Sequence, residues 1–74
     1  QERNTMSTLY PYQQRVVDEK NALDANIGKL ADFIILSAAY KHLGSAEKGR
    51  LDRQHKAMRV YSGVLGERIE AFTP

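Results

Sequence analysis

The sequence contains no cysteine among its 74 residues, which removes two ways of stabilising a short chain. Neither a disulfide nor a thiolate metal site can form, and the redox compartment is left open. A domain this small buries little surface and usually needs disulfides, a metal or oligomerisation to be stable. Oligomerisation is therefore the solution that we expect.

Long apolar runs and a strong net charge are also missing. No stretch reaches the ~18 uninterrupted apolar residues of a membrane span, and no secretory signal is visible. The net charge of +2 is too small to indicate nucleic acid or a membrane surface as a partner. We expect a soluble intracellular protein without a membrane partner. Residues 1–5, ahead of Met6, are interpreted as a tag remnant or a vector-encoded leader.

Motifs that carry chemistry are absent as well. The two histidines, His42 and His55, have no HExxH or other acidic partner pattern around them, so no metal site is expected. There is no glycine-rich phosphate loop, no nucleophile with an evident base and no spaced carboxylate pair. The sequence predicts neither an enzyme nor a cofactor.

What the chain does have is a strong helical period. Apolar residues recur in steps of four and three, with one lysine in the series: Val16, Lys20, Leu23, Ile27, Leu30 and Ile34. Such steps place all six residues on one stripe of a helix. Pro11 suits a first helical turn and Gly44 suits a left-handed C-terminal cap, so a helix is predicted over residues 11–43.

A second helix repeats this pattern after a short connection, with Ser45 as its predicted N-cap. Its predicted inner row is Leu51, Gln54, Met58, Tyr61, Leu65, Arg68 and Phe72, and Thr73 and Pro74 end it. A connection of a few residues makes the helices antiparallel neighbours. The predicted fold is all-α. Residues 1–9 form a leader, and residues 10–74 form one antiparallel helical hairpin with helices over 11–43 and 45–72.

Folding the hairpin at Gly44 brings Lys20 to Arg68 and Val16 to Phe72, to within about one turn. This leaves a second row of apolar residues beside the inner stripes: Val17, Ala31, Ile35, Ala38, Val60 and Val64. Two helices have one mutual interface, so the second row would be exposed in a monomer. We therefore predict a homo-oligomeric bundle of hairpins in which these residues form the interface.

The predicted meeting of Lys20 and Arg68 suggests an anion between them, because two facing cations on an apolar seam are costly. One interpretation is internal neutralisation, since Lys20 and Asp24 have i,i+4 spacing. The other is an anionic ligand, to which Arg68 would offer a fork of donors and Lys20 a point charge.

The open end of the hairpin adds aromatic and basic residues beside that pair. Tyr10 and Tyr12 supply stacking faces for bases, and Arg15 can bind phosphate. The alternative is a hydrophobic staple, in which one tyrosine packs on the first turn or on Phe72. The candidate ligand site consists of Tyr10, Tyr12, Arg15, Lys20 and Arg68.

A basic run occupies the first half of the second helix: Lys48, Arg50, Arg53, Lys56 and Arg59. Such a run could contact a nucleic-acid backbone, but it is more typical of a solvated helix face. Nucleic acid is therefore not an expected partner.

A family resemblance covers nearly everything after Met6. It rests on the run YQQRVVDEKNALDANIGKLADFI and on the later positions Tyr40, Leu43, Glu47, Leu51, Gln54, Met58, Tyr61, Leu65, Arg68, Ile69 and Phe72. These residues resemble a family of small uncharacterised tailed-phage and prophage proteins related to a crAss-like-phage protein. In size and architecture the chain is also similar to helical-hairpin proteins that phages use as sponges for immune signalling nucleotides, in anti-CBASS and anti-Thoeris roles.

The resemblance implies a phage accessory protein in the cytoplasm of the bacterial host cell. It would bind and sequester a small anionic nucleotide immune signal and so counteract host defence. The ligand would lie at the subunit junctions of the oligomer, because one open end has too little wall to enclose it. The alternative is a non-enzymatic adaptor, inhibitor or assembly factor that binds a protein through its apolar helix face.

Overall fold

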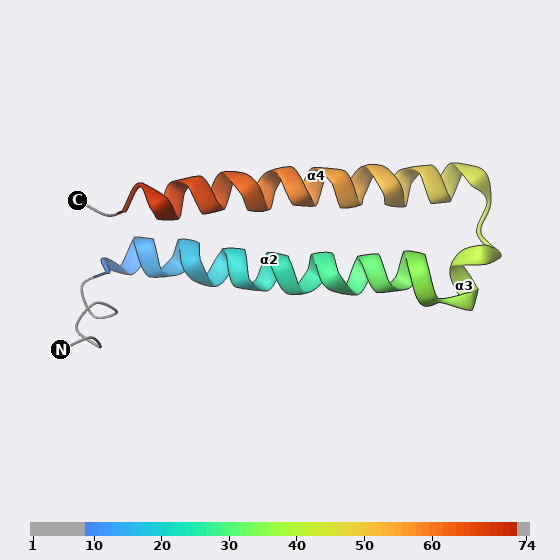
Figure 1. Ribbon diagram of the computed structural model, residues 1–74, viewed down its shortest axis with the longest axis horizontal. Coiled ribbons are helices and arrows are strands. Elements are labelled where there is room, and N and C mark those ends of the chain that lie inside the picture. Colours follow the sequence, from blue (N-terminus) through green and yellow to red (C-terminus); the bar gives the residue numbers. More distant parts are fainter. Residues whose placement is uncertain (1–8, 73–74) are drawn as a thin grey trace.

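The computed structural model describes residues 9–72, and within this range the chain forms three helices and no strand. Helix α2 spans Pro11–Leu36, the single turn α3 spans Ala38–Lys41, and α4 spans Ser45–Glu70. Helices α2 and α4 run antiparallel along the long axis, with α3 at the turn between them (Figure 1). The predicted all-α antiparallel helical hairpin is confirmed, and its assembly into an oligomer stays a prediction. Residues 1–8 of the predicted leader and the predicted stop at Thr73 and Pro74 lie outside the described residues.

Helix α2 begins where the sequence indicates. Pro11 occupies its first turn, where a missing N–H costs nothing, and the preceding Tyr10 is extended with φ −69° and ψ 156°. The Tyr10 backbone N–H donates a hydrogen bond to Oε1 of Gln13 at 2.8 Å. Gln13 is buried, so this contact fixes the direction in which the chain enters the helix.

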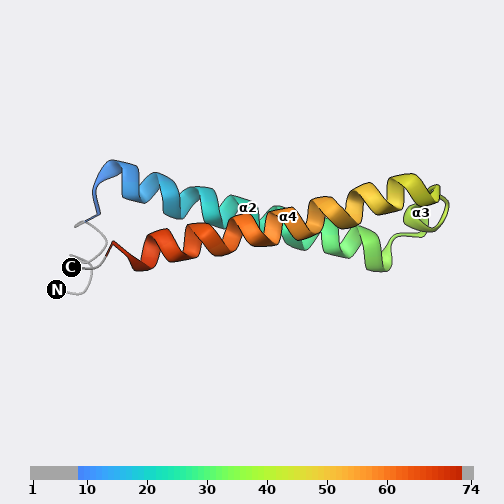
Figure 2. The same ribbon diagram turned by 90° about the horizontal axis from the view of Figure 1, so that it is seen from above.

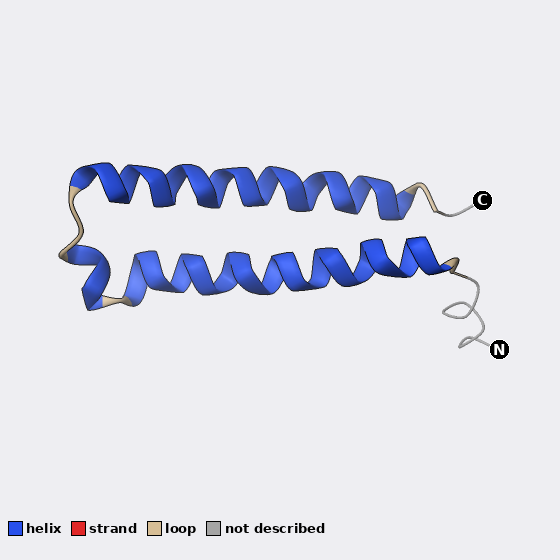
Figure 3. Ribbon diagram, turned by 180° about the vertical axis from the view of Figure 1, so that it is seen from behind, coloured by secondary structure: helices blue, strands red, loops and turns tan. Residues whose placement is uncertain are grey.

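The predicted single helix over 11–43 is interrupted at Ser37. This residue is extended, with φ −81° and ψ 130°, and its side-chain oxygen accepts a hydrogen bond from the backbone N–H of Ala39 at 3.1 Å. A serine side chain offers the backbone an alternative to the helical hydrogen bond, which accounts for the break. Only loops and this short turn connect the two long helices (Figure 3).

The predicted caps at the turn are also corrected. Gly44 has φ −70° and ψ 162°, so it is not left-handed, and it serves as the N-cap of α4 rather than as the cap of the first helix. Ser45, predicted as the N-cap, is the first residue of α4. The turn therefore consists of α3 and a short extended link.

The inner row of α2 lies as predicted, from the buried Val16 to the half-buried Ile34. The inner row of α4 differs: Gln54, Tyr61 and Arg68 are exposed. Their places are taken by the next residue along the chain in each case, so the observed row is Leu51, His55, Met58, Ser62, Leu65, Ile69 and Phe72. This change rotates α4 about its axis relative to the prediction and brings a serine, rather than an arginine, towards Lys20.

The hydrophobic core is a single thin seam. The molecule measures 52 × 19 × 15 Å, and the two long helices cross one another along its length (Figure 2). Among the described residues, the buried apolar side chains are Val16 and Leu65, the latter only 1 % exposed. In the predicted second row, Val17 and Ala31 are half-buried and Ala38 is exposed, while Ile35 and Val60 are 73 % and 69 % exposed. Between residues 9 and 72, no helix has the length and apolar character needed to cross a membrane.

Candidate functional site

Aromatic rings gather at the open end of the hairpin, where α2 begins and α4 ends. The rings of Tyr10 and Tyr12 are nearly parallel, at 9°, with centroids 6.3 Å apart. The ring of Tyr12 also meets the edge of Phe72 at 6.3 Å and 79°. Both tyrosines are exposed, so the contact with Phe72 anchors one ring while ring surface of the pair stays open to solvent. The predicted packing of a tyrosine on Phe72 is therefore present, and part of the ring surface of Tyr10 and Tyr12 remains exposed to solvent.

Two arginines belong to the same end of the hairpin. Arg15 is three residues after Tyr12 on α2, so these two are neighbours on the helix surface. Arg68 lies in the last turn of α4, shortly before Phe72. Both arginines are exposed, and no ion pair joins either of them to another described residue. The open end thus combines ring faces with two positive charges that no residue between 9 and 72 neutralises by an ion pair.

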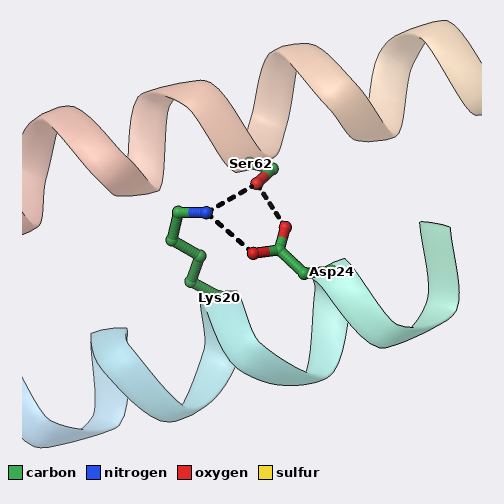
Figure 4. Close-up of polar contacts among 3 residues, drawn as sticks. All are labelled: Lys20, Asp24 and Ser62. Atoms are coloured by element: carbon green, nitrogen blue, oxygen red, sulfur yellow. Dashed lines mark hydrogen bonds and ion pairs between the residues drawn. The ribbon is translucent and has the colours of Figure 1, made fainter. Parts of the chain in front are cut away.

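Lys20, the third predicted cation, points into a polar cluster with Asp24 and Ser62 (Figure 4). Its ammonium lies 2.8 Å from Oδ2 of Asp24 and donates a hydrogen bond to the hydroxyl of Ser62 at 3.1 Å. The Ser62 hydroxyl in turn donates a short hydrogen bond to Oδ1 of Asp24. A Cβ at Gly66 would lie 3.4 Å from Cε of Lys20, so the side chain passes close to α4. The predicted facing of Lys20 and Arg68 is replaced by this contact.

The charges within the cluster of Lys20, Asp24 and Ser62 balance one another. The hydrogen bond from Lys20 and then the one from Ser62 lower the pKa of the Asp24 carboxyl below its ordinary value of 3.8, which keeps the carboxylate charged. This negative charge neutralises Lys20 locally, as the internal-neutralisation interpretation predicted. Lys20 uses two of its three N–H donors in this way, so any anionic ligand at this position would compete with Asp24.

Three residues of the basic run of α4, Lys48, Arg50 and Lys56, interact with neighbouring side chains. Nζ of Lys48 lies 5.3 Å from the ring centroid of Tyr40, and Arg50 pairs with Glu47 at 2.8 Å. Lys56 pairs with Asp52 at 3.2 Å. These contacts are typical of a solvated helix face with local charge pairs, which contribute little to stability.

A shallow hollow of about 380 Å³ lies on α4, lined by Lys56, Arg59 and Val60. These residues are spaced i, i+3 and i+4, so the hollow lies between adjacent turns of one helix. From the sequence, Lys56 and Arg59 were predicted to belong to the basic run and Val60 to the second row. Their i, i+3 and i+4 spacing was the sequence signal that places the three residues together.

Sequence reasoning also missed the role of Ser62. This residue is 8 % exposed and makes both hydrogen bonds that join side chains of α2 and α4 in the described part of the chain. The sequence signal for this role was the position of Ser62 one turn before Gly66, the glycine that leaves space for Lys20. No group of side chains within residues 9–72 has the composition to hold a metal ion.

Comparison with known families adds one match. A family model described as Sequestin matches residues 10–71, which is most of the hairpin and includes Tyr10, Tyr12, Arg15 and Arg68. The chain belongs to the Sequestin family. The family name indicates sequestration, which is a binding role and not a catalytic one. No curated protein and no solved structure matches the chain.

Membership of the Sequestin family favours a binding function over a catalytic one. A sequestering protein must hold its target without changing it, so it needs complementary surface and not an activated nucleophile. The open end of this Sequestin-family hairpin exposes the rings of Tyr10 and Tyr12 and the cations Arg15 and Arg68, which have no ion-pair partner among the described residues.

Proposed function

We propose that this Sequestin-family protein is a phage accessory protein that sequesters a small anionic nucleotide used as an immune signal by the bacterial host. It would act in the host cytoplasm and counteract defence by lowering the free concentration of the signal. The observation that carries the proposal is the exposed pair of stacked tyrosines beside two cations that no described residue neutralises.

Each part of the open end matches one part of a nucleotide. The face of Tyr10 or Tyr12 would stack on the base, which is worth about 1–3 kcal/mol per base in other proteins. Arg15 and Arg68 would bind the phosphates through charge-assisted hydrogen bonds. Lys20 has a smaller part, because Asp24 already balances its charge. A single open end has one wall, so the ligand would lie where hairpins of the oligomer meet.

Isothermal titration of the purified protein against cyclic dinucleotides, cyclic trinucleotides and ADP-ribose-type signals tests this function. We expect at least one member of the panel to bind with a micromolar or lower Kd. The variants Arg68→Gln and Arg15→Gln should each weaken that binding by about 10–100-fold, the usual effect of losing a hydrogen bond to a charged group. Arg53→Gln, which removes an exposed cation from the first half of α4, is the matched control and should leave Kd unchanged.

A second candidate is a protein-binding adaptor, inhibitor or assembly factor, and two observations favour it. The Lys20–Asp24 ion pair closes part of the predicted ligand site, and Ile35 and Leu36 expose apolar surface near the turn. The same titration separates the two functions. No binding tighter than millimolar across the nucleotide panel would remove the nucleotide proposal and leave the adaptor.

A further inference from the structure

One stripe of α4 carries an exposed charge pattern on the side of the helix away from α2, and its lysine, Lys56, makes only an exposed ion pair with Asp52, at 3.2 Å. Lys56, Val60, Gly63 and Glu67 follow one another in steps of four, three and four, so they lie on one face of the helix. The stripe begins with a cation, ends with an anion and has an apolar residue and a glycine between them. All four residues are exposed.

Helix α2 does not cover this stripe, because α4 turns Ser62 and Leu65 towards α2 instead. Val60 is 69 % exposed, and the Lys56 side chain is 72 % exposed. The hollow lined by Lys56, Arg59 and Val60 opens on the same side of the helix. An apolar centre flanked by opposite charges is therefore left in water on the outside of the hairpin.

Gly63 gives an independent reason to expect a neighbour at the centre of the stripe. Glycine is a poor helix former, and Gly63 has no left-handed backbone that would require it. A Cβ at this position would meet nothing within 4 Å, so no contact inside the hairpin excludes a side chain either. A second helix packed closely at this point would be favoured by the absence of a side chain.

We propose that the stripe is the interface of a homodimer, in which α4 packs antiparallel against α4 of a second copy. The spacing is the same in both directions along the stripe. Turning one helix end for end therefore places Lys56 opposite Glu67 and Val60 opposite Gly63, and two-fold symmetry makes each pairing occur twice. A parallel arrangement would instead bring lysine to lysine and glutamate to glutamate, which is repulsive.

This arrangement accounts for the features that the single hairpin leaves unexplained. Val60 of one copy packs over Gly63 of the other, and the Glu67 carboxylate of the second copy approaches the cations of the hollow. The dimer also adds buried surface to a molecule whose described core buries only two apolar side chains, Val16 and Leu65. The inference concerns α4 alone and does not depend on the nucleotide proposed for the open end.

Charge reversal tests the interface. The wild-type protein should have a dimer mass at tens of micromolar in sedimentation equilibrium. Lys56→Glu and Glu67→Lys should each weaken the dimer by about tenfold or more, because each replaces two attractive pairs by two repulsive ones. An equimolar mixture of the two variants should recover the dimer mass, since each reversed charge then faces its opposite on the other chain. Circular dichroism of each variant checks that the hairpin remains folded.

Gly63→Gln provides a second, independent test with Gly28→Gln as its control. A Cβ meets open space at both glycines, so both variants should keep or raise helix content, but only the one at Gly63 should lower the mass. A monomeric wild type at ~100 µM would overturn the proposal and leave the stripe to a different protein. Variants that remain monomeric when mixed, or a mass unaffected by either reversal, would overturn it as well.

Discussion

At the scale of single residues, the cluster of Lys20, Asp24 and Ser62 is the contact that holds α2 and α4 in register. It provides the side-chain hydrogen bonds between these helices in the described part of the chain, and Ser62 makes both of them. Moving α4 by one turn would leave the hydroxyl without its partners and Lys20 without the space beside Gly66. A polar contact within an apolar seam specifies register in this way because only one alignment satisfies it.

Asp24 makes the stability of the hairpin depend on pH. Its pKa is lowered in the folded state, so the unfolded chain binds a proton first as the pH falls. The stabilisation from Asp24 is therefore complete above the ordinary value of 3.8 and is lost as the pH falls through the lower folded value. In thermal unfolding followed by circular dichroism, wild type should be more stable than Asp24→Asn at pH 6. That difference should shrink as the pH falls below 3.8 and through the lowered pKa of the folded carboxyl.

The exposed Asp32 on α2 provides the control for this experiment. Asp32→Asn should have a small effect on the melting temperature at pH 6, within the range usual for surface substitutions. If Asp24→Asn melted at the same temperature as wild type at pH 6, the cluster would not stabilise the fold.

At the scale of elements, the packing of α4 depends on one row of side chains. Leu65 is 1 % exposed, so Leu65→Ala should lower the free energy of unfolding by about 2–5 kcal/mol, the usual cost of removing a buried leucine. Leu36 is 75 % exposed at the end of α2, and Leu36→Ala should change the free energy of unfolding by less than about 0.5 kcal/mol. Urea unfolding measures both. Equal losses would mean that Leu65 is not in the seam.

The two helices differ in how well the sequence predicts their inner rows. In α2 the row is marked by Leu23, Ile27 and Leu30, and neighbouring positions are mostly polar, so the period has one solution. In α4 two adjacent rows share Leu51, Met58 and Leu65. The choice between Tyr61 and Ser62, or between Arg68 and Ile69, depends on what α2 presents opposite them, and local periodicity does not contain that information.

The break at Ser37 and the side-chain contacts at the open end also depend on interactions that local sequence does not predict. Local sequence predicts the start of α2 at Pro11, but the end of α2 depends on whether the Ser37 side chain or the next helical turn satisfies the backbone. At the open end, Tyr12 meets Phe72 as one alternative predicted. The predicted pairing of Lys20 with Arg68 assumed a different rotation of α4 about its axis, and the periodicity of the sequence does not determine that rotation.

At the scale of the whole molecule, the hairpin leaves large apolar side chains exposed outside its thin seam. Ile35 and Val64 of the predicted second row are 73 % and 47 % exposed. Replacing both by glutamate should lower the mass of the oligomer by light scattering and its melting temperature together, since burying one such side chain is worth about 1.5–3 kcal/mol. A wild-type protein that is a well-folded monomer at micromolar concentration would contradict this.

We propose that the protein holds a nucleotide signal without altering it, and ultrafiltration measures both parts of this proposal. The protein is mixed with each nucleotide of the panel, filtered, and then heated to unfold it. For at least one nucleotide, we expect retention by the filter in proportion to the protein added and recovery of the intact molecule after heating. Free passage of every nucleotide through the filter, or recovery of a chemically changed product, would contradict it.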